Sequence, residues 1–434
     1  MSSSTAAMYV FSQVALAIAI CHRIRKKSEP RKKGRPAARV RQRRSVQDVY
    51  ECLGPTYFRR AYRMSYESFW ILHDKLRDGI EEALKEKQTN VPDEGGKLHN
   101  RAPPIPNGSI CTSVRLACAI RYFAGGSPYD ISVMYGMSYS TTMSCVWAVV
   151  DAINHHKEFF EYPESHDEQR SIAEGFKKAS TPEIDICAGA VDGILIWTNK
   201  PTVDECNFLG VGQKKFLCGR KHKFGLNCQA VSDARGRFLD ISIVYGGATS
   251  DCLAFERSKL FGKLSDGMLA EGLCLFRDNA YLNSPFLATP YQNVGPGTKD
   301  DYNFYHSQVR IRIECAFGIF TERWAILRSA IPKQIAITKT IALVHALAKL
   351  HNFCIDVQET QPGEMLPQDV DHMTRNLTGS VPLEADEIED TPRPIQLIGG
   401  GHHFDDVPRD IRRRRQLTPC QPRELLHERI SNEH

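Results

Sequence analysis

The chain has 434 residues, of which 42% are hydrophobic and 25% are charged, and its formal net charge is +5. This length has room for two or three domains, and the apolar content is sufficient for a large core. The small net charge does not by itself indicate a nucleic-acid partner, so the distribution of charge along the chain is more informative.

The fourteen cysteines are not spaced as metal ligands or as a disulfide framework. No C-x-x-C occurs, and most cysteines stand singly in apolar surroundings, as Cys187, Cys228 and Cys274 do. This pattern predicts buried free thiols in a reducing compartment and argues against a zinc site.

Residues 1–44 divide into an apolar lead and a basic arm. The lead, Ala6–Cys21, is shorter than a membrane-spanning helix and is interrupted by Ser12 and Gln13. Basic residues follow this apolar run, whereas a signal peptide has them before it. A packing helix, a short membrane anchor and a misassigned start of the gene all fit, and the interpretations without a membrane are favoured.

The basic arm, residues 23–44, carries twelve Lys and Arg residues and a single acid, Glu29. Such a block of like charge is predicted to be disordered and to bind a partner. Its "KKGRPAAR" stretch resembles the core of an AT-hook, in which Arg35 would enter a narrow A·T minor groove. A nuclear localisation signal explains the same residues equally well, so we expect the protein in the nucleus.

Residues 45–180 are expected to form an all-helical domain. Apolar residues recur at helical spacing after Ser65, which is the predicted N-cap, and the Pro- and Gly-rich residues 88–107 are predicted to be a loop. A short helix near 129–135, a turn and a longer helix from Ser140 read as a helix-turn-helix. The second helix has no basic residue, so it fits a bundle helix as well as a helix that reads DNA bases.

After residue 180 the pattern changes to strands. Three runs rich in β-branched and aromatic residues, 186–197, 223–233 and 237–247, are separated by turn signals. A helix is predicted from Asp251, and another short buried strand follows in "GLCLFRD".

A long helix comes last, because apolar residues recur at helical spacing in "VRIRIECAFGIFTERW". Strands that alternate with helices predict an α/β layered domain over residues 181–356. Residues 357–434 are rich in Pro, Gly and charge and are predicted to be a disordered tail.

Acidic residues follow the predicted strands. Asp192 and Asp278 each close an apolar run, and the strand is expected to end at Asp192, where Gly193 permits a turn. Asp251 follows a strand and a Gly-Gly corner. Ligands of open α/β sheets collect at the carboxyl ends of strands, so these side chains could converge with Glu314 of the last helix. Clustered carboxylates repel one another unless a cation lies between them, and oxygen ligands suit Mg²⁺ or Mn²⁺. Two such ions can cut a phosphodiester.

Each of these carboxylates also has an ordinary structural explanation. An aspartate after a strand is often a turn former or an N-cap. Glu314 could be a helix-surface residue that pairs with Arg310 four positions earlier. The residue pattern alone leaves the structural and the catalytic interpretations open.

A resemblance to a known family adds to this pattern. Across residues 184–356 the segments "GAVDGILIWTNKP", "GRKHKFGLNCQAVSDARGRFLDI", "GGATSDCLAFERSKL", "FRDNAYL", "LATPY", "YNFYHSQVRIRIECAFGIFTERWAIL" and "LHNFCI" occur in order. Together they resemble the Harbinger-type transposases and the nucleases derived from them, which have an RNase H-like DDE catalytic domain. The helical region with "VRLACAIRYFAGGS" is also similar to the N-terminal part of that family.

The resemblance implies that Asp192, Asp278 and Glu314 are the catalytic triad and that Asp251 is a fourth carboxylate at the metal. It implies a divalent cation, Mg²⁺ or Mn²⁺, and a DNA endonuclease or transposase activity. Ile194, Leu195 and Arg277 stand where the family often has Thr, His and Gly. The alternative is therefore a domesticated or decayed DNA-binding protein on the same fold.

Double-stranded DNA is the expected partner. The segment "GQKKFLCGRKHKF" places Lys214, Lys215, Arg220 and Lys221 near the predicted site, where they could neutralise phosphates, although a solvated loop has the same composition. By resemblance we also expect a Myb-like DNA-binding partner protein, and a homo-oligomer is left open.

Overall fold

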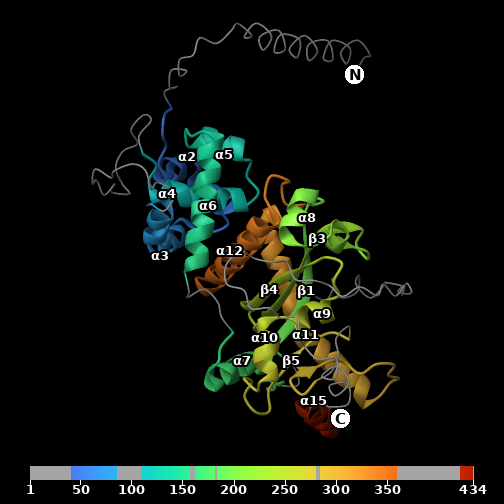
Figure 1. Ribbon diagram of the computed structural model, residues 1–434. Helices are drawn as coiled ribbons and strands as arrows, with labels where there is room; N and C mark the ends of the chain where they lie inside the picture. The colour runs from blue at the N-terminus through green and yellow to red at the C-terminus, as the bar shows by residue number, and fades with distance from the viewer. Residues whose placement is uncertain are drawn as a thin grey trace, which may run out of the picture. The chain divides into compact units, whose positions relative to one another are not determined.

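The computed structural model describes residues 41–85, 109–156, 162–180, 183–279, 284–358 and 421–433. Its N-terminal part is all-helical, as predicted, and appears in blue to teal in Figure 1. The helices are α2 (Val46–Tyr62), α3 (Tyr66–Lys85), α4 (Thr112–Phe123), α5 (Pro128–Met134) and α6 (Tyr139–His155).

The predicted helix-turn-helix is present as α5, a turn and α6. Gly136 has φ 64°, a left-handed conformation that glycine adopts without strain. Ser138 then caps α6, because its hydroxyl accepts a hydrogen bond from the Thr141 amide at 3.1 Å. Ser65 caps α3 in the same way, through a bond from the Ser68 amide at 3.1 Å.

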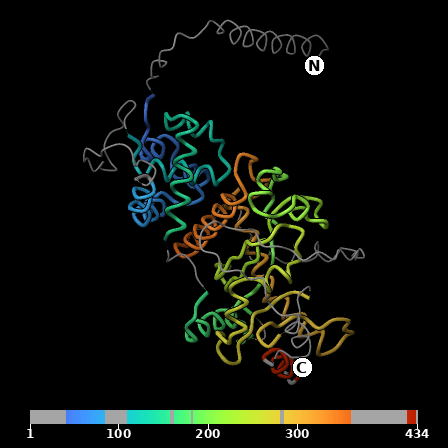
Figure 2. The backbone as a smooth tube through the Cα atoms, in the orientation of Figure 1, coloured from blue at the N-terminus to red at the C-terminus, as the bar shows by residue number. Residues whose placement is uncertain are grey.

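The second part of the chain is a mixed sheet with helices, in green to orange in Figures 1 and 2. Its strands are β1 (Cys187–Trp197), β2 (Leu217–Cys218), β3 (Lys223–Ser232), β4 (Phe238–Gly246), β5 (Cys274–Phe276) and β6 (Leu287–Ala288). Its helices are α7 (His166–Lys178), α8 (Val203–Leu209), η2 (Gln213–Phe216), α9 (Asp251–Glu256), α10 (Lys259–Ser265), α11 (Thr298–Arg323), η3 (Ala325–Arg328) and α12 (Ile337–Asp356).

The central strand of the sheet is β1. It pairs antiparallel with β3 on one side and parallel with β5 on the other. β3 also pairs antiparallel with β4 and β2, and β5 pairs parallel with β6. Three antiparallel strands followed by parallel ones, with helices between them, agree with the predicted RNase H-like fold. The two-residue strands β2 and β6 are too short to give a sequence signal.

The two faces of the sheet carry different helices. Alternate residues of β1 point to opposite faces. On one face, Ala190 belongs to a core that includes Ile313 and Phe320 of α11. On the other face, Val191 belongs to a separate cluster with α9 and α10 that includes Phe255. This division decides which acidic side chains can meet.

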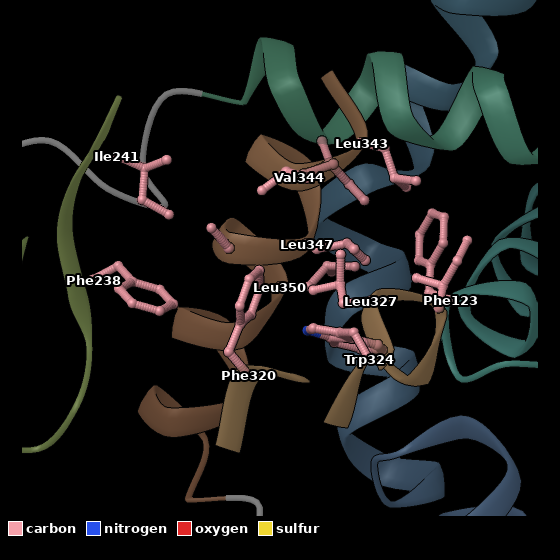
Figure 3. Close-up of a cluster of buried hydrophobic side chains, with 14 of the residues drawn as sticks. Phe123, Phe238, Ile241, Phe320, Trp324, Leu327, Leu343, Val344, Leu347 and Leu350 are labelled. Carbon is pink, nitrogen blue, oxygen red and sulfur yellow. The ribbon is translucent and has the colours of Figure 1, made fainter. Parts of the chain in front are cut away.

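The helical part and the sheet share one hydrophobic core, which Figure 3 shows in close-up. Trp324 is fully buried after α11 and meets Phe123 of α4 edge-on, with ring centroids 6.4 Å apart. Around them lie buried residues of α12, of α11 and of β4: Leu343, Val344, Leu347, Leu350, Phe320 and Phe238. The expected boundary at residue 180 therefore does not divide two cores, and α7, which ends at Lys178, packs on β1 of the sheet.

A half-buried lysine fixes α12 to the end of α6. Lys349 Nζ donates to the carbonyls of Ile153, Asn154 and His156 at 3.2, 2.7 and 3.0 Å. A cation is favourable at a helix C-terminus, where carbonyls lack partners within the helix. Asn154 Nδ2 also donates to the Ala342 carbonyl at 2.9 Å. The α6–α12 contact thus combines apolar packing with directional bonds.

The end of the chain carries a helix, α15 (Gln421–Glu433), which packs on α11. Leu426 and Ile430 are buried, and Arg429 forms an ion pair with Asp185 at 3.0 Å. The prediction of a disordered tail is therefore wrong for residues 421–433. The prediction rested on the composition of the whole tail, which does not reveal a short amphipathic segment within it.

No helix in the described ranges has the length and apolar content needed to cross a bilayer. The apolar lead, Ala6–Cys21, and the basic arm up to residue 40, with Arg35, lie outside the described residues. The cysteines within those ranges are free thiols, as predicted, and Cys187, Cys228 and Cys274 are fully buried.

Candidate active site

Asp192 lies in the middle of the central strand. β1 continues without a break from Cys187 to Trp197, so the expectation that the strand ends at Asp192 and Gly193 is wrong. Asp192 pairs with Ala230 of β3, and its Oδ1 accepts a hydrogen bond from the Gly193 amide at 2.7 Å. The carboxylate is therefore held on a strand with neighbours on both sides, which limits its movement.

The sheet register brings Asp278 level with Asp192. Ala190 of β1 pairs with Phe276 of the parallel strand β5, and each aspartate follows two residues later. A spacing of two residues returns a side chain to the same face of a sheet. The charge of Asp278 also raises the pKa of Asp192, as expected for two neighbouring carboxylates.

The third carboxylate comes from α11, which covers the same face. Ile313 and Phe317 of this helix are buried in the core, and Glu314 lies beside them. Arg310, one turn earlier, donates a hydrogen bond from Nη1 to Glu314 Oε1, and the same nitrogen is 3.9 Å from Asp192 Oδ2. The i−4 pair and the approach to Asp192 are both present, so the helix-surface interpretation and the catalytic one are compatible.

Asp192 has a strongly perturbed carboxyl group. Burial raises its pKa to about 7, and Asp278 and Glu314 act in the same direction. The Gly193 amide and Arg310 oppose this rise in pKa. The raised pKa of Asp192 therefore reflects its burial next to two other carboxylates. Carboxyl groups with raised pKa values concentrate at functional sites.

The donor set suits a hard divalent cation. Three carboxylates supply only oxygen atoms, which Mg²⁺ and Mn²⁺ prefer. Across the described parts of the chain, however, no three His, Cys, Asp or Glu side chains are arranged as a ready metal-binding group. Arg310 contacts both Glu314 and Asp192. The three carboxylates thus have the oxygen atoms that a divalent metal ion needs, but in this structure two of them contact the Arg310 guanidinium.

Asp251 lies on the opposite face of the sheet from the Asp192 carboxylate. Its Oδ1 accepts hydrogen bonds from Asn227 Nδ2 at 2.8 Å and from Gln229 Nε2 at 3.0 Å. Gln229 pairs with Gly193, the neighbour of Asp192, so its side chain points away from α11. Asp192, Asp278 and Glu314 therefore act on one another, whereas the contacts of Asp251 are with Asn227 and Gln229 of β3.

The absence of a side chain at Gly193 allows this arrangement. A Cβ atom at that position would lie 2.5 Å from Asp251 Oδ1 and would also clash with Gln229 Nε2. Asn227 Nδ2 further donates to the Thr249 carbonyl at 3.0 Å, which fixes the corner before α9. Gly193 is thus needed for a close approach and not for the turn that the sequence suggested.

We expect Gly193→Ala to lower the free energy of unfolding by about 1–3 kcal/mol, because the added methyl group overpacks a rigid, hydrogen-bonded cluster. Urea denaturation followed by circular dichroism measures this change. Gly262→Ala is the matched control: a Cβ there meets nothing within 4 Å, and alanine favours the helix. Equal stability of wild type and Gly193→Ala would contradict the close approach of Asp251.

A histidine that the sequence analysis did not single out supports the site. His306 is buried on α11 one turn before Arg310, and its ring stacks on Phe276 with centroids 4.7 Å apart. Its Nε2 lies 3.1 Å from the Ala288 carbonyl, and burial lowers its pKa to about 3, so the ring is neutral. It ties α11 to β5 and β6, which position Asp278. Only the fold reveals this role.

The proposed phosphate-binding residues lie beyond the sheet. Lys214 and Lys215 are in η2, and Arg220 and Lys221 are in the turn between β2 and β3. Lys214, Arg220 and Lys221 are exposed, whereas Lys215 is half-buried. This turn leads into the strand that pairs with β1 as far as Trp197, five residues beyond Asp192. At about 3.3 Å per residue, the strand covers roughly 16 Å over this distance.

Part of the chain is similar to known proteins. Residues 191–352 match the family described as DDE superfamily endonuclease. The chain is also similar to the Putative nuclease HARBI1 of Xenopus laevis, with 22% identity over 281 residues, which cover 62% of this chain and 76% of that protein. No solved structure matches the chain. The matched range includes Asp192, Asp278 and Glu314.

Proposed function

From the premise that residues 191–352 form a DDE superfamily endonuclease domain, we propose that the protein is a divalent-metal-dependent DNA endonuclease or transposase. One observation carries the proposal. Asp192, Asp278 and Glu314 come from three separate elements, and both other carboxylates act on the pKa of Asp192. Such crowding of negative charge is unfavourable by itself, and the single cation Arg310 balances only part of the charge of three carboxylates.

In this proposal Asp192, Asp278 and Glu314 hold the Mg²⁺ or Mn²⁺ ions. The bound ions would activate a water molecule or a 3′-hydroxyl group and stabilise the leaving oxygen of the phosphodiester. The role of the protein is to fix its ligands: Asp192 on a central strand, Asp278 at a strand end and Glu314 on a helix anchored by its apolar face. In this proposal Asp251 supports the site through its bonds to Asn227 and Gln229, and the three other carboxylates are the ligands.

Double-stranded DNA is the proposed substrate. Lys214, Arg220 and Lys221 would contact phosphates, since their side chains are exposed near the strand that carries Asp192. The basic arm with Arg35 would add contacts in the minor groove and direct the protein to the nucleus. A Myb-like partner that supplies sequence specificity is part of the same proposal.

Cleavage of duplex DNA in the presence of Mg²⁺ or Mn²⁺ tests the function. We expect wild-type protein to cut and Asp192→Ala and Glu314→Gln to lose at least about 1,000-fold in rate, because each variant removes a proposed metal ligand. Asp266→Ala is the control, since this exposed acid lies outside the site. Equal cleavage by wild type and Asp192→Ala would refute the proposal.

The second candidate, a DNA-binding protein without cleavage, has one specific observation in its favour. Arg277 is fully buried directly before Asp278, and its guanidinium lies 3.9 Å from the centre of the Phe255 ring. This large side chain stands where the resemblance leads us to expect glycine. Duplex binding without cleavage under either ion, also in Arg277→Gly, would favour this candidate.

A further inference from the structure

The guanidinium of Arg310 lies beside the carboxylates of Asp192 and Glu314. Arg310 is only 21% exposed at its side chain, and it contacts Glu314 directly. The same Nη1 atom is 3.9 Å from Asp192 Oδ2. Arg310 thus lies against two of the three carboxylates that we propose as metal ligands, and it lowers the pKa of Asp192.

A guanidinium and a divalent ion bind carboxylate oxygens at overlapping positions. A metal ion needs oxygen atoms at about 2.0–2.2 Å, and an arginine N–H donor on the same lone pair leaves no room for it. The charges of the two cations would also repel each other. Arg310 must therefore move away from Glu314 before both Glu314 and Asp192 can hold a metal ion.

The alternative is that Arg310 merely orients Glu314 for the metal. Its two contacts distinguish the alternatives. An orienting residue would bond one carboxylate from the side away from its partner, whereas Arg310 contacts Glu314 and also approaches Asp192. Both contacts of this guanidinium among the described residues are with carboxylates that we propose as metal ligands.

We propose that Arg310 is a resident counter-cation that stabilises the metal-free site and competes with the divalent ion for Asp192 and Glu314. This proposal rests on the proposed function, because it assumes that those carboxylates bind a metal ion. In addition, Arg310 would make the affinity of the site for a divalent ion lower than it would be with the carboxylates alone. The protein would thereby fold without metal and bind its ion only when the ion is abundant.

The test measures Mn²⁺ binding to the full-length chain without DNA, by calorimetry and by electron paramagnetic resonance of free Mn²⁺. We expect Arg310→Met, which keeps length but removes charge, to lower the Kd for Mn²⁺ by at least about fivefold, as loss of a partly buried competing cation allows. In the absence of metal its melting temperature should fall, and Mn²⁺ should raise it by more than in wild type.

Arg312→Met is the matched control. This arginine stands on the same helix, is half-buried, and donates to the Ala179 carbonyl at 3.0 Å, away from the carboxylates. Its substitution should leave the Kd for Mn²⁺ within about twofold of wild type. Arg310→Gln serves as a second neutral variant if Arg310→Met does not fold.

The outcomes separate this inference from the proposed function. If wild type binds Mn²⁺ and both neutral variants at Arg310 bind it equally or more weakly, the competition is refuted while the metal site stands. If Asp192→Asn binds Mn²⁺ as well as wild type does, or if no variant binds it, both the inference and the proposed metal site are refuted. Tighter binding in Arg310→Met but not in Arg312→Met supports the inference.

Discussion

Replacement of Trp324 by alanine is expected to lower the free energy of unfolding by about 3–5 kcal/mol, the range for large aromatic side chains removed from well-packed cores. Trp324 is fully buried where α11 ends, and it meets Phe123 of the helical part edge-on. The cavity would open between α4, η3 and α12 (Figure 3). Because this core is shared, the helical part and the sheet should unfold together at a lower urea concentration.

Two further variants make this test specific. The indole N–H of Trp324 has no acceptor among the described residues, so Trp324→Phe loses volume but no hydrogen bond and should cost less than half as much. Phe304→Ala, on the same stretch of chain but 60% exposed, should change stability by less than about 0.5 kcal/mol. Two separate unfolding transitions in Trp324→Ala would contradict the shared core.

Asp192→Asn is expected to stabilise the metal-free protein at pH 8 by about 2–4 kcal/mol, although it should abolish cleavage. The folded-state pKa of Asp192 is about 7, above its ordinary value of 3.8. Between these values the folded protein retains a proton that the unfolded chain has lost, so stability falls as pH rises from about 4 to 7. A shift of about three units corresponds to roughly 4 kcal/mol. Asparagine stays neutral and can still accept the Gly193 amide bond.

Thermal unfolding from pH 5 to pH 8 in the presence of a chelator measures this effect. The wild type should lose stability across this window relative to Asp192→Asn, and added Mn²⁺ should restore it only in the wild type. Asp251→Ala is the contrasting control, because it removes the oxygen that accepts from Asn227 Nδ2 and Gln229 Nε2 and should therefore lower stability. Parallel stability curves for wild type and Asp192→Asn would show that the raised pKa of Asp192 is wrong.

Elements with a long, regular pattern could be predicted from sequence. The apolar stripe of Ile313, Phe317, Phe320 and Trp324 gave the helical character and the buried face of α11. The strands β1, β3 and β4 and the α5–α6 helix-turn-helix were found because their residues follow one period between clear turn signals. The resemblance then supplied the order of the acidic residues, which periodicity cannot give.

The rest depends on contacts between distant residues. Gly193 looks like a turn signal, but β1 continues through it because it pairs with Gln229 of β3, and its missing side chain leaves space for Asp251. The face on which Asp251 lies is set by its partners Asn227 and Gln229 on β3, and a shift of one residue would reverse it. His306 and α15 likewise gain their roles only from partners far along the chain, such as Ala288 and Asp185.

The attachment of α6 to α12 would fix the position of a DNA duplex relative to the proposed catalytic site, if the helical part binds that duplex. Within the described residues, three carbonyl bonds from Lys349 and the packing around Trp324 hold the helix-turn-helix against the part of the chain that bears Asp192. The distance between a duplex bound to the helical part and the proposed catalytic carboxylates would then be fixed. Such a protein would cut DNA at a fixed number of base pairs from the site where its helical part binds.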